Sequence, residues 1–262
     1  MSNTILSLLL AHVISDFYCQ TDQSCKEKSE WKCGAWIAHC GWVLVLSFLA
    51  IFTPNHWFGA LIAALVIMST HLIVDILKVK YENRSREKNQ DEKGESIWPF
   101  VIDQVLHIVV IFATPIILFR VCQDYHCWTE EIDTTIFLII LAFIVVAKPS
   151  NTFVRLCLKS AKINVGDDSE SDDKFHSGKI IGTCERFLIL TFVLLSQYEA
   201  IGFLVAATSI LRFGSTKESE KSEYVLAGTL LSIAIALVLG LIVVYRTELA
   251  SIIYTVLPII SY

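Results

Sequence analysis

The chain has 262 residues, of which 54% are hydrophobic and 18% are charged, with a formal net charge of −5. A soluble domain of this length carries more charge and shorter apolar runs, so the composition excludes an ordinary soluble protein. The acidic balance gives no reason to expect a nucleic-acid partner, and membrane lipids are the surroundings that such a chain requires.

Apolar segments repeatedly reach the length that crosses a membrane, about 17 to 25 residues for a hydrocarbon core of about 30 Å. In chain order, the predicted spans are residues 3–19, 35–53, 58–79, 97–120, 134–155, 178–196, 198–213 and 223–245. We therefore expect an all-α fold, a polytopic transmembrane helix bundle of about eight spans.

The loops between these spans differ sharply in their content of Lys and Arg. Eighteen of the 21 basic residues lie in the odd-numbered loops, and only Arg120 and Arg246 lie in the remaining loops and ends. Because Lys and Arg are retained on the cytoplasmic side, we predict that the odd-numbered loops are cytoplasmic and that both termini are outside.

An acidic stretch, residues 167–173, lies in the fifth loop and is typical of a solvated connection. It suggests two halves, an N-terminal four-span half at 1–122 and a C-terminal four-span half at 123–262. The first half holds every intramembrane histidine, and the second holds the acidic cytoplasmic loop and a Glu-Arg pair.

Seven ionisable side chains interrupt the four N-terminal spans, although each costs about 2.5–3.5 kcal/mol on insertion scales. They are His12, Asp16, His39, His71, Asp75, Asp103 and His107. All except His39 form pairs at i,i+4 spacing, which places both members on one helix face. Imidazoles and carboxylates are ligands of divalent metals such as Zn²⁺. We therefore predict a metal site formed by all seven, with Asp16 and Asp103 as catalytic carboxylates.

The predicted topology brings these side chains to one level. With a rise of about 1.5 Å per residue, they fit in a slab about 10 Å thick at the cytoplasmic side. Seven donors exceed the four that a tetrahedral Zn²⁺ needs, so they suit two ions, or one ion with supporting carboxylates. A structural lattice between helices would more often pair Asp with Arg or Lys.

The C-terminal half adds a second polar set at the same predicted level. Glu185 and Arg186 are embedded in the sixth span, and Arg212 ends the seventh. An Arg at this depth suits a phosphate or carboxylate of a substrate. An interhelical Glu185–Arg pair, with Arg212 reaching the lipid headgroups, is an equally good interpretation.

Several of these motifs resemble one protein family. They are Leu10-Ala11-His12, Asp16-Phe17, Gln20-Thr21, His39, His71 to Asp75 with Lys78, and Asp103-Gln104 with His107, joined by a later stretch from Gly178 to Arg186. The chain is thereby similar to domain-of-unknown-function family 3307, an uncharacterised family of bacterial integral membrane proteins. The resemblance implies a multi-pass protein of the bacterial inner (plasma) membrane and supplies no activity.

Three functions would use such a site. The first, which we favour, is a membrane-embedded, zinc-type hydrolase in which the ion activates water and a spare Asp is the general base, acting on an amphiphilic or phosphorylated substrate. The second is a divalent-metal transporter, although transport sites are expected near the membrane midplane. The third is a non-catalytic sensor or assembly protein with a structural metal. The sequence leaves the oligomeric state open.

Overall fold

The computed structural model describes residues 2–88, 96–121, 127–161, 171–213 and 219–246. All regular structure within these ranges is helical, which confirms the predicted all-α fold. The elements are α1 (Ser2–Val13), η1 (Ile14–Tyr18), α2 (Asp22–Ser29), α3 (Cys33–Ile51), η2 (Pro54–His56), α4 (Trp57–Lys88), α5 (Trp98–Val121), η3 (Trp128–Glu131), α6 (Thr134–Val146), α7 (Lys148–Ser160), α8 (Ser171–Leu194), α9 (Tyr198–Phe213) and α10 (Ser219–Val244). Of the short turns, η1 is π-helical, and η2 and η3 are 3₁₀.

Four of the described helices, α3, α4, α5 and α10, are long and apolar enough to cross a membrane. The pair α6 and α7, which meet at a bend of 43°, makes a fifth candidate if it counts as one span. The first helix with η1, and α9, are apolar but shorter. The structure thus agrees with a membrane protein, while the count of eight spans and the outside position of both termini stay predictions.

The chain divides into two compact units, Met1–Leu141 and Ala142–Tyr262. This boundary lies inside α6, later than the division at 122/123 drawn from the sequence. The first unit extends further because η3 is fixed to the start of α1. There, Asn3 Nδ2 donates to the carbonyls of Thr129 (3.0 Å) and Ile132 (2.7 Å).

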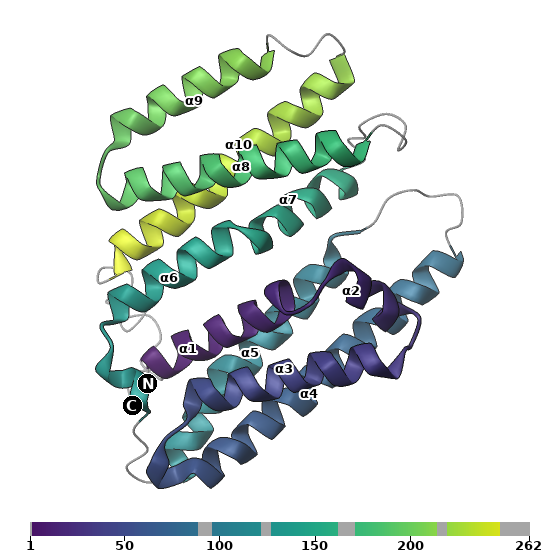
Figure 1. Cartoon of the computed structure of the whole chain (residues 1–262), viewed down its shortest axis with the longest axis vertical. Coiled ribbons are helices and arrows are strands. Elements are labelled where there is room, and N and C mark those ends of the chain that lie inside the picture. Colours follow the sequence, from purple (N-terminus) through teal and green to yellow (C-terminus); the bar gives the residue numbers. More distant parts are fainter. Residues whose placement is uncertain (1, 89–95, 122–126, 162–170, 214–218, 247–262) are drawn as a thin grey trace. The chain divides into compact units, whose positions relative to one another are not determined.

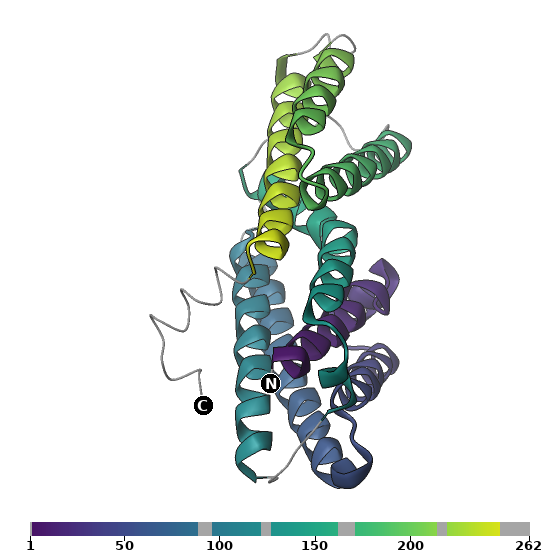
Figure 2. The same ribbon diagram turned by 90° about the vertical axis from the view of Figure 1, so that its left-hand side faces the viewer.

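The first unit is a bundle in which α1, α3, α4 and α5 form a ring, each helix contacting two others (Figure 1 and Figure 2). The centre of the ring is aliphatic over much of its length, with Leu8, Val43, Ile67 and Ile111 among its buried residues. The short helix α2 contacts α3 and α4 at one end of the bundle, which we call the α2 end.

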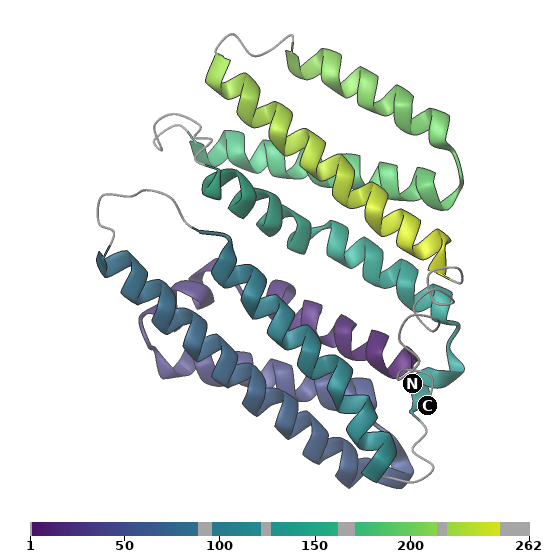
Figure 3. The same cartoon turned by 180° about the vertical axis from the view of Figure 1, so that it is seen from behind.

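The second unit is built on α8 and α10, which run closely against each other (Figure 3). A Cβ atom at Gly240 of α10 would lie 2.6 Å from Val193 of α8, so only glycine permits this approach. Small residues at helix contacts are the usual means of close packing in membranes. Helix α7 contacts α10 and α8, and α9 contacts α8.

A buried arginine ties the helices of the second unit together. Arg186, on α8, is only 1% exposed. Its Nε donates to the carbonyl of Val146 (2.8 Å), at the break between α6 and α7. Its Nη1 donates to Ser232 on α10 (2.9 Å), and its Nη2 to Asn151 on α7 (2.5 Å). The guanidinium therefore satisfies polar groups of three neighbouring helices.

We expect Arg186→Met to destabilise the second unit by on the order of 3 kcal/mol, because it leaves a buried carbonyl and a buried hydroxyl without partners. The measurement is thermal unfolding of the purified chain in detergent, followed by circular dichroism. Lys179→Met removes a positive charge from the same helix at an exposed position and is the matched control. Equal unfolding midpoints for the two variants would contradict the anchoring role.

Candidate metal centre

The seven residues predicted as metal ligands converge inside the first bundle, on the side of the α2 end. They come from every helix of the ring: His12 from α1, Asp16 from η1, His39 from α3, His71 and Asp75 from α4, and Asp103 and His107 from α5. All are at most about one-tenth exposed. The i,i+4 spacing thus places both members of each pair on the inner face of its helix, as its periodicity predicts.

The position of Asp16 depends on the π-helical turn at the end of α1. In this turn the N–H of Cys19 donates to the carbonyl of Ile14 (2.9 Å), one residue further than in an α-helix. Such turns occur frequently at functional sites, where they re-aim a side chain. The Ser15 hydroxyl donates to the carbonyl of His12 (2.9 Å) and to Asp16 Oδ1 (3.3 Å). The carboxylate is thereby aimed at the imidazoles.

Asp16, His39 and His71 present three donor atoms to one point. The Nε2 atoms of His39 and His71 are 2.9 Å apart. Asp16 Oδ1 lies 3.3 Å from the Nε2 of His71 and 3.8 Å from that of His39. Ligands held about 2.0–2.2 Å from a tetrahedral Zn²⁺ lie about 3.3–3.6 Å from one another. One of the three distances, 3.3 Å, falls in this range, and the other two, 2.9 and 3.8 Å, lie just below and just above it, so small shifts would bring the three atoms to the face of a zinc site.

A second carboxylate approaches the same imidazole pair. Asp75 Oδ2 lies 3.3 Å from His39 Nε2 and 3.8 Å from His71 Nε2. Acceptor atoms converge at this distance only when a proton or a cation lies between them, because lone pairs and carboxylate charges repel.

The remaining imidazoles, His12 and His107, lie on the other side of Asp16 and His71. The ring centroids of His107 and His71 are 4.0 Å apart, and those of His107 and His12 are 5.0 Å apart. His12 Nδ1 is 3.8 Å from Asp16 Oδ1. Both ring nitrogens of His107 are buried without a hydrogen-bond partner, as is Asp103 Oδ1. Buried polar atoms are nearly always satisfied, so these atoms indicate a place for an ion or a water molecule.

Three groups of three residues bring one donor atom each within 4.8 Å of one another. Group A is His12, Asp16 and His107; group B is Asp16, His39 and His71; and group C is His71, Asp75 and His107. Groups A and B share Asp16, whose Oδ1 lies within 3.8 Å of a ring nitrogen in each group. Asp103 belongs to none of the three, although its Oδ1 lies 3.8 Å from His107 Nδ1. Asp103 is therefore not among the residues whose donor atoms lie close enough together to bind one metal ion.

Two lysines neutralise two of the three carboxylates. Lys28, from α2, forms an ion pair with Asp75, and Lys78, from α4, with Asp103 (2.9 Å). Among the described residues, no Lys or Arg is paired with Asp16. Three carboxylates against two ammonium groups leave one negative charge when the imidazoles are neutral. That charge lies at Asp16.

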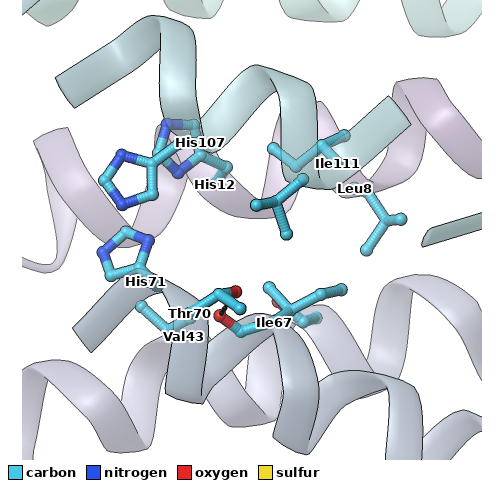
Figure 4. Close-up of a pocket in the computed structure, with 10 residues that line it drawn as sticks. Leu8, His12, Val43, Ile67, Thr70, His71, His107 and Ile111 are labelled. Carbon is cyan, nitrogen blue, oxygen red and sulfur yellow. Dashed lines mark hydrogen bonds between the residues drawn. The ribbon is translucent and has the colours of Figure 1, made fainter. Parts of the chain in front are cut away.

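A small cavity adjoins the imidazoles on the side away from α2 (Figure 4). Its volume of about 10 Å³ is the least that one water molecule needs. His12, His71 and His107 line one side, and Leu8 and Ile111 are among the aliphatic residues that line the rest. A water molecule or an ion there would contact the imidazoles within apolar walls.

Sequence reasoning missed three contributors to this centre. Lys28 was counted only among the charges of a loop, and no periodicity marks it because α2 is a short polar helix. Lys78 and Gln104 appeared only in the family motifs. Lys78 could have been found, since it lies seven residues after His71 and thus on the same face of α4. Gln104 Nε2 donates to Asp103 Oδ2 (3.1 Å), which fixes the carboxylate from its own helix.

The residues predicted to hold a substrate behave differently. Arg186 is buried and bonded to its neighbours in the second unit, so the structure gives it a packing role in place of the predicted substrate contact. Glu185 beside it is also buried. The side chain of Arg212 lies outside the described residues.

Comparison with known families places the first unit in one of them. The family described as protein of unknown function (DUF3307) matches residues 4–136, more than half of the chain. The match contains all seven ligand candidates and both lysines. No curated protein and no solved structure matches the chain. The chain therefore belongs to the DUF3307 family.

Proposed function

We propose that this chain is a membrane-embedded, metal-dependent hydrolase that holds a zinc-type ion at Asp16. The observation that carries the proposal is the overlap of groups A and B, each of which offers three donors. Three protein ligands and an open fourth position characterise catalytic zinc sites, whereas structural sites have four protein ligands. The adjoining cavity has room for the water molecule that would take the fourth position.

Charge favours one ion over two. The centre carries one net negative charge, from three carboxylates and two ammonium groups. One divalent ion with a bound hydroxide brings this sum to zero, and a second divalent ion would leave a large uncompensated positive charge in a low dielectric. The expected cofactor is therefore a single divalent metal ion, of the zinc type.

The bound ion would supply a water molecule of lowered pKa. The protein would supply the path for its proton. His107 faces the cavity, and its Nδ1 lies 3.8 Å from the unpartnered Asp103 Oδ1. Lys78 and Gln104 both donate to Asp103 Oδ2, which turns Oδ1 toward the imidazole. In this proposal group B would hold the ion, with Asp16 as a ligand, so that His107 stays free of metal, and Asp103 is the general base acting through His107.

The membrane surroundings guide two further parts of the proposal, the class of substrate and the side of the membrane on which the centre lies. The Lys and Arg distribution favours a cytoplasmic position for the α2 end, and the family resemblance is our reason for proposing the bacterial inner membrane. We infer an amphiphilic or phosphorylated substrate from the position of the centre inside an apolar helix bundle, while the cavity beside the imidazoles has room for one water molecule only. No residue of the second unit is required for this site.

The first test is the metal content of purified protein, measured by elemental analysis after loading with Zn²⁺ and desalting. We expect about one ion per wild-type chain, and less than about a tenth of that in Asp16→Asn, because both groups lose their shared ligand. Asp22→Asn removes a carboxylate from the exposed start of α2 and should leave the content unchanged. Two ions per wild-type chain would contradict the charge argument.

The second test separates the roles of the two carboxylates. With an amphiphilic phosphate ester in detergent micelles, Asp103→Asn should lower kcat about 100-fold while the metal content stays at the wild-type level, because the variant loses only the proton acceptor. Asp16→Asn should lose both metal and turnover. Joint loss of metal in both variants would show that Asp103 is a ligand.

A second candidate, transport of a divalent metal, is favoured by one observation about depth. The exposed aromatic residues Trp57 and Tyr81 bracket α4, as side chains at the two membrane interfaces do. His71 lies between them, about 21 Å from one level and about 15 Å from the other at 1.5 Å per residue. A transport site is expected near the midplane.

Flux in proteoliposomes decides between the candidates. If the chain is a hydrolase, vesicles that contain it should take up Zn²⁺ no faster than vesicles that contain Asp16→Asn, since the centre then has access from one side only. Uptake at least about tenfold above that variant would establish transport as the function. A fluorescent zinc indicator inside the vesicles gives the measurement.

A further inference from the structure

Lys28 is an unusual residue of the α2 helix. The helix is polar, and Lys28 is its one buried residue, with only 5% of its surface exposed. Its ammonium group forms the ion pair with Asp75 and lies 4.9 Å from the centre of the Trp36 ring. Burying a lysine is costly unless the charge is compensated, so the position needs a specific partner.

The docking of α2 fixes this position. Asn83 Nδ2 on α4 donates to the carbonyl of Ser29 (3.0 Å), at the end of α2. Trp31 follows in a left-handed conformation (φ 60°) and stacks on Trp36 of α3 (5.9 Å between centroids). The ammonium group of Lys28 is thus held at the bundle by contacts with two of its helices.

The oxygen that binds Lys28 is also the one that faces the imidazoles. Asp75 Oδ2 lies 3.3 Å from His39 Nε2, and Asp75 supplies the carboxylate of group C. A metal ion in group C would compete with the ammonium group for this carboxylate. Lys78 makes a similar ion pair with Asp103, but Asp103 belongs to none of the groups found among the described residues.

We propose that Lys28 is a tethered cation that keeps metal ions out of group C and thereby confines them to the groups that share Asp16. The inference rests on the proposed metal centre and adds the residue that selects among its overlapping donor sets. A lysine in this place keeps Asp75 paired with a permanent cation, whereas Asp16, which pairs with no Lys or Arg within the described ranges, is left for the exchangeable ion.

The test uses the metal content of the full-length chain in variants that lack Asp16. Asp16→Asn alone should bind less than about a tenth of the wild-type content, because Lys28 blocks the remaining group. The double variant Asp16→Asn with Lys28→Met should recover about one ion per chain, held by His71, Asp75 and His107. Adding Asp75→Asn should abolish the recovery.

Two control variants show whether the recovery of metal binding depends on removing the positive charge beside Asp75. Asp16→Asn with Lys78→Met removes a lysine from a carboxylate outside the groups and should recover no metal. Asp16→Asn with Lys28→Arg keeps a cation beside Asp75 and should also recover none. Lys28→Gln keeps a hydrogen-bond donor and replaces Lys28→Met if the latter fails to give a monodisperse protein.

The outcomes separate this inference from the proposed function. Metal in the wild type, its loss in Asp16→Asn and no recovery in either neutral double variant would overturn the role of Lys28 alone. Metal retained in Asp16→Asn would overturn it too, because group C would then be open. A wild-type chain without metal would overturn the proposed function, and the single variant Lys28→Met must then bind about one ion for the inference to stand.

Discussion

The constraint on which the first unit depends is the burial of three carboxylates among four imidazoles inside an apolar bundle. An uncompensated charge in such surroundings costs several kcal/mol, so every carboxylate needs a counter-charge or a proton. Two lysines provide counter-charges for Asp75 and Asp103. The features that surround the centre follow from this need: α2 is docked so that Lys28 reaches inward, and Lys78 lies on the face of α4 that carries the cluster.

The sequence was sufficient for the parts of this centre that helical periodicity controls. Three i,i+4 pairs in neighbouring spans indicate which face of each helix turns inward. Loops rich in Lys and Arg alternate with loops that have few, and this alternation predicts the direction of each span and thus a common level for the pairs. The π turn was not predictable, because one additional residue in a turn changes no composition and no average spacing. Lys28 was hidden for another reason: α2 has no apolar face, and its buried residue is a charge. The division at 122/123 stays a prediction; the compact unit in the structure continues to Leu141, and Asn3 ties η3 to it through backbone carbonyls, which the sequence does not display.

The two units handle buried polar groups in different ways, and the difference separates packing from function. Arg186 donates hydrogen bonds to a carbonyl, a hydroxyl and an amide of its own unit. These bonds compensate the free-energy cost of burying the guanidinium group. In the first unit, both nitrogens of His107 and Asp103 Oδ1 have no such partner. A satisfied network needs nothing more, whereas an incomplete one indicates a missing ligand. In the sequence the Glu-Arg motif was already the weaker signal, because an interhelical pair explained it as well as a substrate contact did.

Seven candidate ligands need not bind several metal ions, because two of the three carboxylates are paired with lysine ammonium groups and only the third is left for an exchangeable metal ion. Each lysine removes one carboxylate from the competition for metal while keeping it ionised and oriented. What remains is Asp16, which no lysine in the described part of the chain contacts, at the point where groups A and B meet. The Lys78 side chain is 25% exposed, whereas all seven ligand candidates are at most about one-tenth exposed, and Lys28 is carried by the helix that covers the same end. Because each of these lysines is already paired with a carboxylate, an exchangeable ion that enters from this end would meet two neutral ion pairs and would be attracted by the remaining negative charge at Asp16.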